Sequence, residues 1–111
     1  MAVAREVADE YLKQGGRRIL VAGSMGPTSK SLSLSPDVSD PGFRPYSFDQ
    51  MREAYREQAQ ALLEGGADLL LIETCFDALN VKAALCAVPD GFPVIVSVSV
   101  GDKSGRTLTG Q

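Results

Sequence analysis

The sequence predicts an α/β fold in which helices cover a parallel sheet. Helical and strand-like segments alternate along the 111 residues, in the order helix, strand, helix, strand, helix, strand. The strand-like segments are apolar on both faces, which is typical of parallel strands buried between helical layers. We expect right-handed crossovers between successive strands, because connections of this type are almost always right-handed.

The first two elements follow from a four-residue spacing and a short apolar run. The spacing of Val3, Val7 and Tyr11 predicts a helix over residues 1–14, and two consecutive glycines end it. Residues 18–23 (RILVAG) are apolar and follow a turn, so they predict a buried strand.

A long segment without sustained periodicity, residues 24–47, comes next and is rich in Ser, Pro, Asp and Gly. Loops of this length in compact domains are usually functional or disordered. Because Leu32, Leu34, Phe43 and Tyr46 supply apolar anchors, we expect an ordered loop, with a floppy insertion as the alternative.

The clearest helix follows this loop. Ser47 and Gln50 have the spacing of a capping box, and the helix that they begin ends at a second pair of glycines. Its apolar face predicts packing, and its charged residues are expected to be solvated. Residues 67–73 (ADLLLIE) predict a second buried strand.

The last helix and strand are also punctuated by polar residues. We expect Thr74 to cap a helix that runs to about Val88, with Asp77 at the matching capping-box position. Residues 93–100 (PVIVSVSV) are rich in β-branched residues and predict a third strand, and residues 101–111 are polar and turn-rich.

Composition excludes several functions. Eleven basic against 14 acidic residues give a net charge of −3, so we expect neither nucleic acid nor a membrane as a partner. The chain has no long apolar run, no signal-like N-terminus and no histidine. With only two cysteines it is not a disulfide scaffold, and a reducing, cytoplasmic location is expected. Neither standard glycine-rich nucleotide motif occurs.

Candidate chemistry gathers where the predicted strands end, because the loops after parallel strands share one edge. Glu73 closes an apolar run, so it is either a ligand-facing acid that binds a cation such as an amino group, or a structural carboxylate satisfied by backbone N–H groups or a lysine. Ser24 and Gly26 lie in a turn that either presents N–H groups to a carboxylate or is an ordinary connection.

The two cysteines predict little reactivity. Cys75 is expected in the first turn of the third helix, where a thiol can become reactive, although an apolar filler is the favoured interpretation. Cys86 is expected in the core. The two are eleven residues apart and no histidine accompanies them, so a metal site built from this chain alone is not expected.

Three segments resemble a known family: GSMGPTSKSLSLSPDVSDPGFRPYSFDQM, YREQAQALLEGGADLLLIET and the closing SGRTLTGQ. They are similar to the homocysteine-binding barrel of cobalamin-dependent methionine synthase, a homocysteine S-methyltransferase domain. Betaine-dependent and other homocysteine methyltransferases share the domain, with a looser similarity expected around residues 30–39. The resemblance implies a (β/α)8 TIM barrel. Residues 1–111 are expected to form part of it, roughly strands three to five, incomplete at both ends.

The resemblance also implies a function. In the family, zinc held by three cysteine thiolates binds the homocysteine sulfur, and methylcobalamin supplies the methyl group that forms methionine. Glu73 matches the glutamate that holds the homocysteine amino group, and Ser24, Gly26 and Thr74 lie in matching segments expected at the substrate face. The family's NC and GGCCG zinc motifs are absent. We therefore expect no catalytic residue, no metal ligand and no bound zinc or methylcobalamin in this chain alone.

Two kinds of function remain open. The chain is either a piece of an enzyme, with homocysteine, the remaining barrel strands and the cobalamin and folate domains as partners, or a non-catalytic half-barrel that serves as a binding or assembly module or is an inactive truncated fragment. A methyltransferase that uses betaine or another donor is a further alternative.

Overall fold

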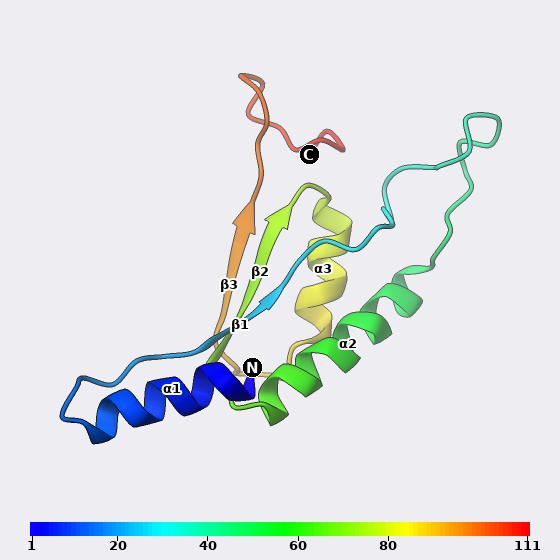
Figure 1. The fold of residues 1–111 in the computed structure, drawn as a ribbon. Coiled ribbons are helices and arrows are strands. Elements are labelled where there is room, and N and C mark those ends of the chain that lie inside the picture. The colour runs from blue at the N-terminus through cyan, green and yellow to red at the C-terminus, as the bar shows by residue number, and fades with distance from the viewer.

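The computed structural model describes residues 1–111 and contains three helices and one three-stranded parallel sheet of order β1-β2-β3 (Figure 1). The α/β class is confirmed, and an open parallel sheet with flanking helices is the arrangement expected of part of a barrel. In chain order the elements are α1 (Ala2–Lys13), β1 (Ala22–Met25), α2 (Phe48–Glu64), β2 (Leu69–Cys75), α3 (Ala78–Ala87) and β3 (Val94–Val98).

The core lies between the sheet and the helices α2 and α3, which pack against each other and against the strands (Figure 1). Side chains alternate across the sheet, so Met25, Leu70 and Ile72 point into this core and are fully buried. No helix covers the other face of the sheet, where Ile95 of β3 is 54% exposed. The sheet therefore has one packed face and one bare face, and Ser24 belongs to the bare one.

Helix α2 is formed as the sequence predicts. The Ser47 side chain accepts a hydrogen bond from the Gln50 amide, and the Gln50 side chain accepts one from the Ser47 amide. Both partners of the capping box are thus present. The helix buries Met51, Tyr55 and Ala59.

The first two strands begin later than predicted. The strand expected over residues 18–23 corresponds to β1, which begins at Ala22. It begins there because the first pairing with β2 is that of Ala22 with Leu69. Before that point, the Val21 amide donates to the Asp68 carboxylate at 2.8 Å and the Val21 carbonyl accepts from the Asp68 amide. Residues 18–20 lie outside the sheet.

Thr74 does not cap the third helix, contrary to prediction. It belongs to β2, and Asp77 is the N-cap, with its side chain accepting a hydrogen bond from the Leu79 amide. The strand continues to Cys75 across a β-bulge that follows Ile72. Between the pair Ile72↔Val96 and the pair Cys75↔Val98, β2 advances by three residues and β3 by only two. The extra residue returns Cys75 to the core face.

The cysteine predictions are half right. Cys75 is an apolar filler, 3% exposed, but it ends β2 and does not begin α3. Burial raises the pKa of its thiol, which opposes reactivity. Cys86 is exposed on α3, so its expected place in the core is wrong.

The remaining apolar residues of the N-terminal half are less buried than expected. Helix α1 buries only Ala8, and Val3 and Val7 are exposed. Of the four anchors predicted for the long loop, only Leu32 is buried. None of the helices combines the length and the apolar character that crossing a membrane requires.

Candidate functional site

Three connections leave the sheet at the ends of its parallel strands, and they meet at one edge of the molecule (Figure 1). They are the loop that follows β1, the short link between β2 and α3, and the tail that follows β3. Hydrogen bonds join all three: the Gln111 side chain of the tail donates to Ser33 of the loop and accepts from the Ala78 amide at the start of α3. This edge contains all the residues that the sequence suggested for substrate binding.

Glu73 and Ser24 meet on the bare face of the sheet. The Ser24 hydroxyl donates a hydrogen bond to Glu73 Oε1, across the parallel pairing of β1 with β2. Glu73 is half-buried and takes part in no salt bridge. Neither a lysine nor a backbone N–H group satisfies it, so its second oxygen remains able to accept hydrogen bonds from a bound ligand.

Gly26 lies just past β1 and is held through its backbone. The hydroxyl of Tyr55, a buried side chain of α2, donates to the Gly26 carbonyl at 3.0 Å. Burial raises the pKa of this phenol, so Tyr55 stays protonated and remains a donor. A Cβ on Gly26 would meet no atom within 4 Å. The turn therefore depends on the hydrogen-bonded Gly26 carbonyl, and a residue with a side chain would fit at this position.

Thr74 lies beside Glu73 in the bulge of β2 and has a φ of 59°, the only positive φ of a non-glycine residue in the chain. A β-branched residue is rarely found in this left-handed region, and such conformations cost about 1–3 kcal/mol. The Thr74 side chain is exposed and makes no hydrogen bond. Its contribution to the site is thus conformational, because the bulge sends Glu73 to one face and Cys75 to the other.

Two buried polar residues at the start of α3, Asp77 and Asn80, were not recognised as part of the site from the sequence. Asp77 was expected only as a helix-capping residue, yet it also accepts hydrogen bonds from Ser31 and Ser33 of the long loop. The alternating serines of SLSLS, which present a hydroxyl at every second position, were the available signal. A buried carboxylate requires such partners.

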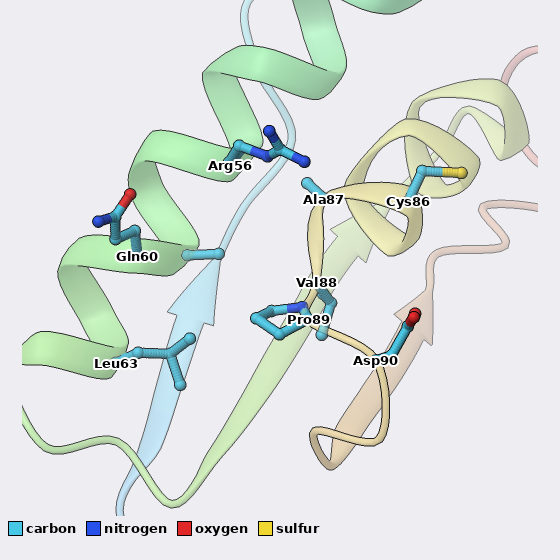
Figure 2. Close-up of a pocket in the computed structure, with 9 residues that line it drawn as sticks. Arg56, Gln60, Leu63, Cys86, Ala87, Val88, Pro89 and Asp90 are labelled. Carbon is cyan, nitrogen blue, oxygen red and sulfur yellow. The ribbon is translucent and has the colours of Figure 1, made fainter.

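A large hollow of the structure lies away from this edge. It has a volume of about 540 Å³ and lies between α2 and the end of α3, on the helical side of the sheet, with walls that include Arg56, Leu63 and Val88 (Figure 2). None of the residues suggested for substrate binding lines it. A smaller hollow of about 260 Å³ lies beside the tail at the candidate site, next to Phe76 and Ser99.

The residues of this chain do not fit the zinc site that the resemblance implies. No three side chains of the His, Cys, Asp or Glu type are grouped so that they could hold a metal ion. Cys75 is buried at the end of β2 and Cys86 is exposed on α3. No chemical step is therefore assigned to zinc in this chain.

A family comparison agrees with the fold. The model of the family described as homocysteine S-methyltransferase matches residues 1–111. The match extends from α1 to the tail, so it includes Ser24, Glu73 and the three connections at the strand ends. The chain belongs to the homocysteine S-methyltransferase family.

Proposed function

We propose that this chain supplies part of the homocysteine site of a methyltransferase, and that Glu73 binds the amino group of the substrate. The single observation that carries the proposal is the state of the Glu73 carboxylate. It stands at a strand end on the bare face, with the Ser24 hydroxyl as its partner and no cation beside it. A protonated amino group would satisfy the free oxygen with a charge-assisted hydrogen bond.

The roles of the chain's own residues follow from this arrangement. Ser24 orients the carboxylate by donating to one of its oxygens, and the other oxygen accepts from the ammonium group of homocysteine. The tethered Gly26 turn borders the same end of β1 and limits where the rest of the substrate lies. Methyl transfer forms a carbon–sulfur bond, breaks the bond between the methyl group and its donor, which keeps the bonding electrons, and removes the thiol proton. We propose that residues outside this chain, on further strands of the barrel, activate that thiol.

The methyl donor that we propose is methylcobalamin, which makes the complete protein a cytoplasmic methionine synthase. The support is the resemblance of the loop around residues 30–39 to the methionine synthase version of the domain. Betaine is the alternative donor. Methyl transfer assays of the complete protein with each donor in turn would separate them, and turnover with betaine alone would contradict the proposal.

Glu73→Gln in the complete barrel domain tests the proposed role. The substitution keeps the size of the side chain and removes its charge, so homocysteine affinity measured by calorimetry should fall by about 1.5–3 kcal/mol, or about 10- to 150-fold. Glu57→Gln is the matched control, because Glu57 is an exposed residue of α2 without an ion pair.

A substrate analogue makes the test specific. 4-Mercaptobutyrate is homocysteine without its amino group, so it should bind the Glu73→Gln variant and the unaltered domain equally well. If the variant binds homocysteine with unchanged affinity, or loses affinity for the analogue to the same extent, Glu73 does not bind the amino group.

A further inference from the structure

Asp77 is the most heavily hydrogen-bonded carboxylate of the chain, although the function proposed above gives it no role. It is 2% exposed. Its Oδ2 accepts from the Ser31 hydroxyl at 2.5 Å and from the Ser33 amide at 3.0 Å, and its Oδ1 accepts from the Ser33 hydroxyl at 2.6 Å and the Leu79 amide at 2.9 Å. One bond caps α3, and the other three hold the loop.

Neighbouring side chains continue the attachment of the loop. Asn80 lies one turn further along α3. Its Oδ1 accepts from the Leu32 amide at 3.0 Å, and its side-chain amide donates to the Lys30 carbonyl at 2.9 Å. Arg44, which belongs to the same loop, donates to the carbonyls of Leu32 and Ser33. Side-chain hydrogen bonds from Asn80 and Arg44 thus hold the backbone of residues 30–33. An exposed loop without a positioning role does not need so many bonds.

The attachment is linked to the candidate site through both segments that it joins, which are the loop after β1 and the connection from β2 to α3. Asp77 follows Glu73 by four residues, and Ser31 follows Ser24 by seven. The Ser24–Glu73 bond joins β1 to β2 just before the loop begins, and the Ser31–Asp77 bond joins the loop to the residue that caps α3. Between these two bonds, the position of the Gly26 turn relative to Glu73 is confined.

We propose that Asp77 is a positioning residue that fixes the loop after β1 relative to the Ser24–Glu73 pair and so preorganises the homocysteine site; this inference rests on the function proposed above. A loop held in one place binds a ligand without first losing conformational freedom, and small displacements of site residues are costly. Asp77 need not touch the substrate to act in this way.

The cap of α3 and the attachment of the loop can be separated by mutation. Ser31→Ala with Ser33→Ala removes both hydroxyl donors but leaves Asp77 and its bonds from the Leu79 and Ser33 amides in place. Ser31→Thr with Ser33→Thr keeps both hydroxyls and is the conservative rescue. Ser39→Ala is the matched control, since Ser39 is an exposed serine of the same loop whose hydroxyl makes no hydrogen bond.

The experiment combines hydrogen exchange of the 111-residue chain with calorimetric homocysteine binding by the complete barrel domain. For the double alanine variant, we expect faster exchange of the Leu32 amide, which is bonded to Asn80 and to neither serine hydroxyl. We also expect unchanged protection of the Leu79 amide and homocysteine binding at least about tenfold weaker. The double threonine variant should restore both properties, and Ser39→Ala should change neither.

Each contrary result has its own meaning. Unchanged loop exchange in the alanine variant would show that the two hydroxyl bonds to Asp77 do not hold the loop. Faster exchange with unchanged affinity would show that the loop does not position the site, and either result overturns the inference while the Glu73 role stands. If the unaltered barrel domain binds no homocysteine, the proposed function itself is wrong, and the positioning role falls with it.

Discussion

The hydrogen bond between Tyr55 and Gly26 is a measurable link between the core and the candidate site. Tyr55→Phe removes only the hydroxyl, because the ring of this 2%-exposed residue can keep its packing. The change leaves the Gly26 carbonyl, 3.0 Å from that hydroxyl, without its partner. The net contribution of such a bond is about 0.5–1.5 kcal/mol, so we expect a loss of about 1 kcal/mol in the free energy of unfolding.

Urea denaturation followed by circular dichroism measures this loss. For a small protein with an m-value of about 1–3 kcal/mol/M, a loss of about 1 kcal/mol lowers the midpoint by about 0.3–1 M without changing the slope. Tyr46→Phe is the control, because Tyr46 is 43% exposed and its hydroxyl makes no hydrogen bond. Its effect should stay within about 0.5 kcal/mol.

Two results would refute this reasoning. If Tyr55→Phe and Tyr46→Phe have the same midpoint, the bond to Gly26 contributes nothing to stability. A loss well above about 3 kcal/mol, or a changed m-value, would show that the ring does not keep its place and that packing is responsible.

Three further predictions concern other parts of the structure. A thiol reagent such as Ellman's reagent should modify Cys86 quickly and buried Cys75 only on unfolding, and two equally fast thiols would contradict the assigned burial. Gly23→Ala should lower the unfolding free energy by about 1–3 kcal/mol in urea denaturation, because the new Cβ would lie 3.1 Å from side chains of α2 and β2, whereas Gly26→Ala should have little effect. Burial opposes ionisation of Asp77, yet its hydrogen bonds hold the pKa below the ordinary value. The stabilising contribution of the carboxylate is therefore complete above about pH 4 and is lost as the pH falls through the lowered pKa. Asp77→Asn should reduce the acid sensitivity of the urea midpoint, and an unchanged pH profile would contradict this.

The success of the sequence predictions follows the range of the interactions that they describe. The capping box of Ser47 and Gln50 is confirmed because both partners lie within one helical turn. The strand bounds were wrong where a distant partner decides them. Ile19 and Leu20 are as apolar as strand residues, but the ladder begins only at Ala22, where β2 is present to pair with it.

The bulge in β2 illustrates the same limit. Local capping rules predicted Thr74 as the cap of α3 and placed Asp77 three residues into the helix. The pairing of β2 with β3 instead keeps Thr74 in the strand, and Asp77 is the cap. The prediction that Cys86 is buried was wrong for a related reason. The side of α3 that faces the sheet depends on how the helix docks, and its composition, which is mostly apolar, does not determine that side.

The sequence by itself determined the alternation of elements, the parallel class, the capping of α2 and the place of Glu73 at a strand end, because each depends on neighbours along the chain. Only the tertiary structure decided that Ser24 is the partner of Glu73, that Tyr55 holds the Gly26 turn, and that Asp77 fastens the loop. These contacts join residues 49, 29 and 46 positions apart. Which hydroxyl reaches which carboxylate over such separations depends on strand register and helix docking, and local sequence patterns do not encode either.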